Sequence, residues 1–230
     1  ILLIFIILFS LSSINSRLFM EKKEELYDLR YIEVIGLDDA TNFEIEQNLN
    51  FLKNTNIFFI DREILKDQIS KYNFIENYNI YKSYPSKIIL KLQLTDFLAK
   101  TVRNNKVFII GSNSKFISTE KFDKYKDLPV VYGKFSPEKF ISFFNNINKS
   151  NLNYKDIQEI FFYPSGRIDI KIKNNLLIKF PLKNLEEALI RVDKIINNMN
   201  LKNNIIDLRV SNQLILSNEW KKFKCFYRLW

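Results

Sequence analysis

The sequence predicts an α+β protein, with an apolar N-terminal segment, a small β-α-α-β-β domain over residues 28–95 and a β-rich domain over residues 96–217. Three observations support this prediction. The 230 residues are 47% hydrophobic, which is enough for one large or two small cores. Helix-capping signals precede apolar residues at helical spacing. Several short runs alternate apolar and polar residues, as half-buried strands do, and predict mostly antiparallel strands with two helices in the second domain.

Residues 1–16 begin with the apolar run ILLIFIILF and become small and polar before Arg17. A full membrane span needs about 20 apolar residues, so this segment could be the surviving end of a longer one. A secretory signal peptide is the alternative. We favour an uncleaved transmembrane anchor, because no clear small-x-small cleavage site precedes MEKKEE. In either case the residues after position 20 should lie outside the cytoplasm.

The small domain should open with a strand at residues 31–35, YIEVI, and continue into two amphipathic helices. Thr41 and Glu44 have capping-box spacing before the first helix, and Asp61 can cap the second. The apolar stripes expected after these caps are Ile45, Leu49 and Leu52, and then Leu65, Ile69 and Tyr72.

Two further strands, at residues 75–82 and 87–94, should complete this domain, joined by SYPS. Apolar and polar residues alternate in the second of them, which is the period of a half-buried strand. The residues expected on its buried face are Ile88, Leu90, Leu92 and Leu94.

The second domain is predicted to have strands separated by polar turns, with two helices among them. One helix should begin at Ser136 with Pro137 in its first turn, and Asn184 and Glu187 should frame the other. The expected strands are 98–102, 107–110, 157–163, 168–172 and 176–180, followed by a hairpin over Ile205–Leu216 that breaks at Ser211-Asn212.

The composition argues against several kinds of chemistry. The chain has no histidine, the commonest metal ligand and general base, and Cys225 is its single cysteine. Its four glycines are isolated, so no phosphate-binding loop is present. Glu186 and Glu187 should lie in a first helical turn, where the helix dipole favours negative charge. We expect no catalytic residue, no metal, no cofactor and no small-molecule substrate.

The net charge of +9 could indicate nucleic acid or an anionic membrane as a partner. Lysine and asparagine recur throughout with isoleucine and phenylalanine, a bias typical of an AT-rich genome, so we expect no nucleic-acid partner. The tail at residues 218–230 mixes basic and aromatic residues. It could lie at a membrane interface or against a partner, or it could fold back on its own domain.

Several segments of the sequence, taken in their order along the chain, resemble the motifs of a known family. IEVIG, NIFFIDREILKDQI and IENYNIYKSYPSKIILKLQL are similar to the strands and helices of a POTRA domain. LPVVYG, GRIDIKIKNNLLIKF and IDLRVSNQLIL are similar to motifs of the β domain that follows it in the FtsQ/DivIB family of bacterial cell-division proteins. TDFLAK, IIGSNS and the glycine-free last turn depart from the family pattern.

The resemblance implies a single-pass protein of the bacterial inner membrane, with its folded domains in the periplasm, at the division septum. Such proteins organise septal cell-wall synthesis without catalysis, together with other divisome proteins. Family members bind FtsB, itself paired with FtsL, through the last strand of the β domain, and an exposed strand edge can accept such an added strand.

On this chain the resemblance places the partner-binding residues in and before the last strand. Ile206, Leu208 and Val210 should hold the domain together. Arg209 could pair with an acidic partner residue or form a salt bridge within the domain. The implied partner-binding residues are Arg209, Val210, Gln213, Leu214, Ile215, Leu216 and Ser217.

Two rival functions belong to other classes. A POTRA-bearing envelope chaperone or secretion component would bind client strands, but only one POTRA-like unit is visible in the sequence. An enzyme acting on cell-wall polymer would need a cleft with perturbed carboxylates, which the sequence does not display.

Overall fold

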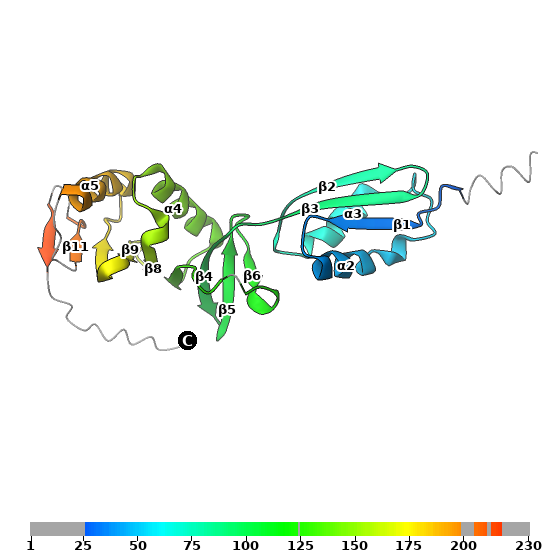
Figure 1. Cartoon of the computed structure of the whole chain (residues 1–230). Coiled ribbons are helices and arrows are strands. Elements are labelled where there is room, and N and C mark those ends of the chain that lie inside the picture. Colours follow the sequence, from blue (N-terminus) through cyan, green and yellow to red (C-terminus); the bar gives the residue numbers. More distant parts are fainter. Residues whose placement is uncertain (1–25, 124, 199–204, 211–212, 218–230) are drawn as a thin grey trace, which may run out of the picture. The chain divides into compact units, whose positions relative to one another are not determined.

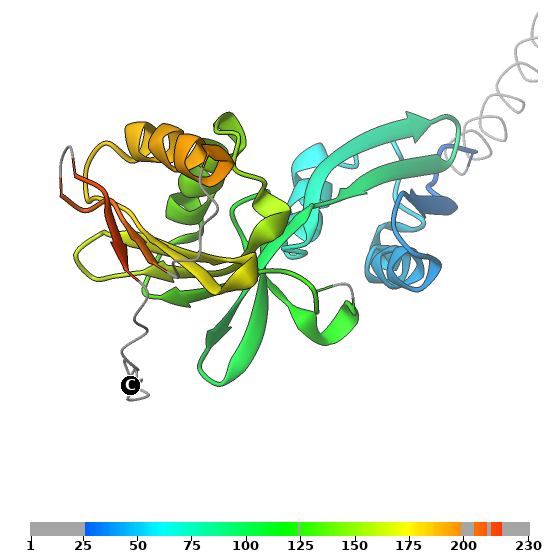
Figure 2. The same ribbon diagram turned by 60° about the vertical axis from the view of Figure 1, so that its left-hand side comes forward.

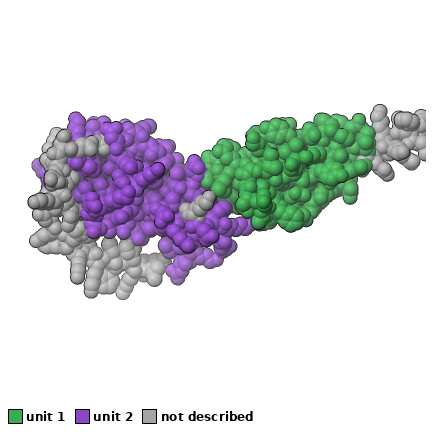
Figure 3. Space-filling model, in the orientation of Figure 1, with its two compact units in different colours: residues 1–95 green, residues 96–230 purple. Residues whose placement is uncertain are grey.

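Residues 26–123, 125–198, 205–210 and 213–217 are described by the computed structural model of this chain. They form an α+β fold, as predicted, in which unit 1 ends at Thr95 and unit 2 begins at Asp96 (Figure 3). The expected anchor at residues 1–16 and the tail at 218–230 lie outside the described residues. Among the described residues, no helix has the length and apolar character needed to cross a membrane.

In unit 1, the residues from Leu26 onward form a three-stranded sheet with helices packed on one face (Figure 1). Its elements, in chain order, are β1 (Tyr31–Ile35), α2 (Asp39–Asn48), the 3₁₀ turn η1 (Asn50–Leu52), α3 (Arg62–Ser70), β2 (Ile75–Ser83) and β3 (Lys87–Leu94). The sheet has the order β1-β3-β2, in which β1 is parallel to β3 and β2 is antiparallel to it. This is the predicted β-α-α-β-β order.

Helix α2 begins earlier than the sequence predicted. The Asp38 carboxylate accepts a hydrogen bond from the Thr41 amide at 3.0 Å and caps the helix, so the predicted capping box of Thr41 and Glu44 is wrong. Thr41 lies inside the helix and is buried. Aspartate caps a helix at least as well as threonine, and Asp38 precedes Thr41 in the chain. Leu52 packs in the core as expected, but from η1 after the α-helix has ended.

Helix α3 is capped by Asp61, whose carboxylate accepts a hydrogen bond from the Glu63 amide at 3.0 Å. Tyr72 lies beyond the end of this helix, so its expected place in the helical stripe is wrong. The prediction that Leu94 lies on the buried face of β3 is also wrong, because this residue is 40% exposed. It pairs with Ile75, where a bulge shifts the register between β2 and β3 and reorients the last side chains.

The described residues of unit 2 form one nine-stranded sheet, in the order β12-β11-β10-β9-β8-β7-β4-β5-β6. Its strands are β4 (Phe97–Arg103), β5 (Lys106–Gly111), β6 (Phe116–Ser118), β7 (Val130–Gly133), β8 (Ile157–Phe162), β9 (Ile168–Ile172), β10 (Leu176–Lys179), β11 (Ile205–Asp207) and β12 (Ile215–Ser217). The pairings β4–β7, β7–β8 and β10–β11 are parallel, and the others are antiparallel. Strands β6 and β7 were not predicted, because such short runs show too little alternation.

Helices α4 (Pro137–Lys149) and α5 (Leu185–Asn198) cover one face of this sheet (Figure 2, green and orange helices). Ser136 caps α4 as expected, whereas Asn184 has a φ of 61° and lacks the extended backbone of an N-cap. Facing residues of successive strands form an apolar row under the helices. That row is Val131, Ile160, Ile170, Ile178 and Ile206, and it ends at the partly buried Leu216.

Gly133 should be the glycine of unit 2 at which an added side chain is least tolerated. A Cβ at this position would lie 1.9 Å from the Phe162 carbonyl oxygen, whereas one at Gly166 would lie 3.3 Å from the nearest atom, a Leu182 methyl carbon. Both glycines have a φ close to +90°, so Gly166→Ala reports backbone strain alone, about 1–3 kcal/mol. We predict that Gly133→Ala lowers the free energy of unfolding clearly more than Gly166→Ala, measured by urea unfolding. Equal losses would contradict this account.

Candidate functional site

Strand β12 forms one edge of the sheet in unit 2. It pairs antiparallel with β11, so that Asp207 faces Ile215, Ile206 faces Leu216 and Ile205 faces Ser217. Among the described residues, no strand lies beyond it. An edge strand of this kind can accept a further strand from another chain.

The pairing of β11 with its other neighbour determines which backbone groups of β12 face outward. The Leu208 amide donates to the Lys179 carbonyl oxygen at 3.0 Å, so Ile206 and Leu208 direct their backbone groups toward β10. Because these groups alternate along a strand, Asp207 directs its own groups toward Ile215 on β12. Leu216, the next residue of β12, therefore directs its N–H and C=O away from β11, toward the open edge.

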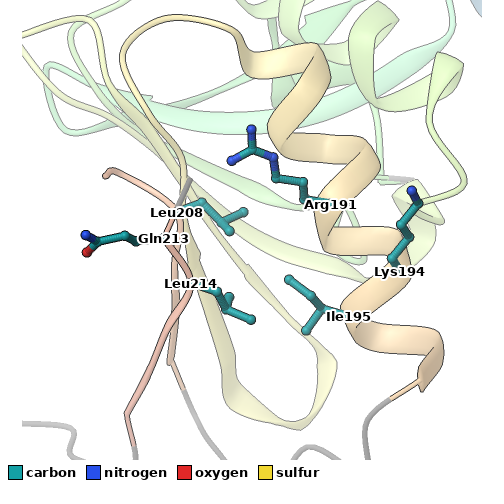
Figure 4. Close-up of a pocket in the computed structure, with 6 residues that line it drawn as sticks. All are labelled: Arg191, Lys194, Ile195, Leu208, Gln213 and Leu214. Atoms are coloured by element: carbon teal, nitrogen blue, oxygen red, sulfur yellow. The ribbon is translucent and has the colours of Figure 1, made fainter. Parts of the chain in front are cut away.

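A groove of about 450 Å³ lies between helix α5 and the β11–β12 hairpin, on the helix-covered face of the sheet. Figure 4 shows that Leu208 and Leu214 point toward Ile195 on the helix, while Gln213 points away from it. The residues that line this groove are Arg191, Lys194, Ile195, Leu208, Gln213 and Leu214.

The groove combines an apolar floor with positive charge from one helix. Arg191, Lys194 and Ile195 are three and four residues apart on α5, so they share one side of it. The Arg191 guanidinium lies 3.8 Å from Glu187, one turn earlier, and its side chain remains 41% exposed. The arrangement suits a short segment that carries apolar side chains and a carboxylate.

Arg209 forms a salt bridge within the domain, one of the two alternatives that the sequence left open. Its Nε donates to both carboxylate oxygens of Asp207, at 2.8 and 2.9 Å, and its Nη2 donates to Oδ2 at 2.5 Å. Burial acts to raise the pKa of Asp207, but the hydrogen bonds from Arg209 outweigh it and hold that pKa below its usual value. The same pair raises the pKa of Arg209.

Asp207 belongs to a charged row on the face of the sheet opposite the helices. The register aligns Asp169, Lys179 and Asp207 on β9, β10 and β11, so a cation lies between two carboxylates. Asp169 is only 1% exposed. Burial raises its pKa, although the Arg167 guanidinium, with Nε 3.1 Å from Oδ1, opposes this effect. The row ties the hairpin to the sheet through charge on one face and apolar packing on the other.

The other residues predicted for this region lie in the core, in the groove, in strand β12 or on the surface. Ile206 and Leu208 are buried as expected, but Val210 is 47% exposed, so its predicted place in the core is wrong. It comes two residues after the last backbone bond to β10. Gln213 and Leu214 line the groove, and Ile215, Leu216 and Ser217 form β12.

The helix side of the groove was not among the residues predicted from the sequence. Arg191, Lys194 and Ile195 flank the apolar stripe of α5 at helical spacing, so their shared side was visible in the sequence. What the sequence could not show is that this side faces the hairpin. Among the described residues, no group of three or more histidine, cysteine, aspartate or glutamate side chains could hold a metal ion.

Two family models match the chain. One, described as "POTRA domain, FtsQ-type", matches residues 28–93. The other, described as "Cell division protein FtsQ/DivIB, C-terminal", matches residues 101–209. The second match ends before β12.

Similar proteins include two from Rickettsia, each named "Cell division protein FtsQ". The one from Rickettsia bellii (strain RML369-C) is 24% identical over 207 residues, which cover 88% of this chain and 76% of the relative. The one from Rickettsia typhi (strain ATCC VR-144 / Wilmington) is 24% identical over 203 residues, covering 81% and 71%.

A solved structure, the major extracytoplasmic domain of the division protein DivIB from Geobacillus stearothermophilus, matches with 12% identity and a TM-score of 0.33. The match covers 46% of this chain and 98% of that chain.

Arg209→Ala should destabilise unit 2 at neutral pH, because it leaves the mostly buried Asp207 carboxylate without its partner. Hydrogen bonds to charged groups contribute about 1.5–3 kcal/mol, and we expect a loss of about 1 kcal/mol because the Arg209 side chain is 44% exposed. The folded pKa of Asp207 lies below 3.8, so the stabilisation is present above that value and is lost as the pH falls through the folded pKa.

Urea unfolding at about pH 7 and about pH 3 measures this dependence, since carboxylates titrate between these values. Arg209→Lys is the matched control, because it keeps the charge but loses the two-pronged geometry, and it should show a smaller loss. A loss that is the same at both pH values would rule out the ion pair as its cause.

Proposed function

This chain belongs to the FtsQ/DivIB family of bacterial cell-division proteins, and on that premise we propose that it is a non-enzymatic scaffold of the division machinery. In this proposal residues 1–16 anchor it in the inner membrane, and its folded units lie in the periplasm at the septum. It binds FtsB, paired with FtsL, through strand β12 and helps to organise septal cell-wall synthesis. Family membership favours this function over that of a chaperone or secretion component.

The observation that carries this proposal is the outward backbone of Leu216 at the edge of the sheet. A partner segment that pairs with β12 can bond to the Leu216 N–H and C=O, and main-chain bonds of this kind supply affinity with little sequence preference. The apolar row of the sheet ends at Leu216. A residue of the added strand placed beside Leu216 would extend that row.

The groove supplies the sequence preference that the backbone lacks. A partner side chain that points to the helix-covered face would meet Leu208, Leu214 and Ile195, so it should be apolar. A neighbouring carboxylate could pair with Arg191 or Lys194. We therefore propose that the partner segment alternates apolar residues with residues that face the open side of the sheet, and that it carries an acidic residue next to the helix.

Arg209 has a supporting role in this proposal. Its contacts with Asp207 are inside the domain, so it shapes the hairpin that carries β12. The partner-binding residues are then Gln213 to Ser217 together with Arg191, Lys194 and Ile195, and Val210 lies beside them on the surface.

Leu216→Pro should weaken the binding of the periplasmic part of the cognate FtsB, because proline has no N–H to offer an added strand. One backbone hydrogen bond contributes about 0.5–1.5 kcal/mol, so we expect up to a tenfold rise in Kd, measured by isothermal titration calorimetry. Proline is tolerated at an edge strand when its nitrogen faces outward. Leu216→Ala is the matched control, because it loses the side chain but keeps the N–H. Equal Kd values for these two variants would contradict strand addition at this edge.

Leu214→Lys should also weaken this binding, whereas Ile215→Lys should affect it much less. The two residues are adjacent and similarly exposed, at 40% and 46%, but Leu214 lines the groove and Ile215 lies in the row of the opposite face. Partial loss of a buried leucine contact is worth about 1.5 kcal/mol, or roughly tenfold in Kd. If both lysines raise the Kd to the same extent, the partner's side chains do not occupy the groove.

A further inference from the structure

Three aromatic side chains of unit 1 lie in contact on its surface at one end of the sheet, where Phe58 stacks on Tyr84 and is tilted against Tyr27. The ring of Phe58 lies 5.1 Å from that of Tyr27 and 4.9 Å from that of Tyr84. Phe59, the next residue, is 82% exposed, and Phe58 and Tyr84 are each more than half exposed. We call Tyr27, Phe58, Phe59 and Tyr84 the aromatic end. Exposed aromatic residues gathered in this way mark an interaction surface.

Backbone hydrogen bonds join the three segments that carry these residues. The Ile57 amide donates to the Tyr27 carbonyl oxygen at 2.9 Å, which ties the loop before α3 to the start of the described chain. The Arg30 amide donates to the Ser86 carbonyl oxygen at 2.9 Å, which ties that start to the β2–β3 turn. Figure 1 shows this turn and the start of β1 at the same end of unit 1.

The exposed phenylalanines are held in place by the loop that carries them. The Lys82 ammonium donates to the carbonyl oxygens of Ile57 and Ile60, at 2.8 Å each, and so fixes both ends of the loop to β2. The Asn56 side chain accepts from the Phe58 amide at 3.0 Å, and its carbonyl accepts from the Phe59 amide at 3.0 Å. Phe59 therefore projects from an ordered turn, and little conformational entropy remains to be lost when it meets a partner.

Through Tyr27, the aromatic end is close in sequence to the proposed membrane anchor at residues 1–16. Eight residues lie between Arg17 and Leu26, and a fully extended chain between these two positions spans at most about 30 Å. If residues 1–16 are in the membrane, as proposed above, the aromatic end cannot lie far from the lipid surface. Both aromatic residue types suit that surface. The phenylalanine ring is apolar and can be buried among lipid, and the tyrosine ring is apolar with a polar tip that can remain among the headgroups.

We propose that the aromatic end of unit 1 inserts into the headgroup region of the membrane, with Phe59 as its most exposed side chain. The inference rests on the proposed anchoring by residues 1–16. It gives unit 1 a second contact with the bilayer and orients its sheet, because the opposite ends of β2 and β3 then point away from the lipid. Gln93, near that opposite end, lies about 20 Å from the β2–β3 turn at the usual strand rise.

The test places a fluorophore at each end of unit 1 in the full chain. Because Cys225 is the single cysteine, Cys225→Ser gives a background in which Ser83→Cys or Gln93→Cys is labelled with NBD. The Ser83 site reports the aromatic end without removing a ring, and the Gln93 site is the matched control. The protein is reconstituted into vesicles of phosphatidylethanolamine and phosphatidylglycerol, with and without lipids that carry a nitroxide near the headgroup.

We expect NBD at position 83 to emit at shorter wavelength in vesicles and to be quenched by the nitroxide lipids, and NBD at position 93 to show neither effect. Adding Phe58→Asp and Phe59→Asp to the Ser83→Cys chain should abolish the quenching, with the thermal unfolding midpoint as the check on folding. Quenching that survives both aspartate substitutions would overturn the assignment of the membrane contact to the aromatic end.

Three other outcomes also overturn the inference. The first is that the protein co-floats with the vesicles in a density gradient while NBD at position 83 stays in water. This result would show anchoring without insertion, and it would leave the proposed function intact. A blue shift without lipid quenching assigns the aromatic end to a protein contact, such as a second copy. Chain that does not float with vesicles removes the anchoring proposal itself.

Discussion

The parallel pairing of β11 with β10 is the constraint on which the candidate site depends. It comes from the hydrogen bond between the Leu208 amide and the Lys179 carbonyl and from the register of the two strands. That pairing sends the backbone of Asp207 toward β12, which leaves Leu216 facing the open edge. It also places the side chain of Leu208 under α5, where it forms the floor of the groove. The edge and the groove therefore follow from the same strand alignment.

The two faces of the sheet hold the hairpin by different means. On the helix-covered face, an apolar row continues from Ile178 through Ile206 to Leu216. On the opposite face, Lys179 lies between Asp169 and Asp207, and the latter also binds Arg209. A row of buried charges stabilises little unless its members are paired, and here each buried carboxylate has an arginine beside it. Such partnering fixes the register of strands as short as β11 and β12, because a shift by one residue would turn the charges into the core.

Residue patterns predicted the order of elements in unit 1, the strands of unit 2 other than β6 and β7, and several helix caps, because capping side chains and alternation are local signals. Asp61 and Ser136 cap their helices as expected. The errors arose where a second local signal or a distant contact competed. Asp38 caps α2 ahead of Thr41, and a bulge opposite Leu94 exposes that residue. The groove could not be predicted, because its two walls are separate in the sequence and only the packing of α5 brings Ile195 to Leu214. Nor could the sequence decide whether Arg209 pairs inside the domain.

The brevity of the outer strands has a consequence for assembly. Both edges of the large sheet, β6 and β12, are only three residues long. A three-residue strand directs only one or two residues outward, so two copies that met edge to edge would gain few hydrogen bonds and would not polymerise readily. A partner segment at the proposed site would therefore obtain most of its selectivity from the groove beside β12. Changes on the surface of α5 could then alter partner preference while the backbone edge stays the same.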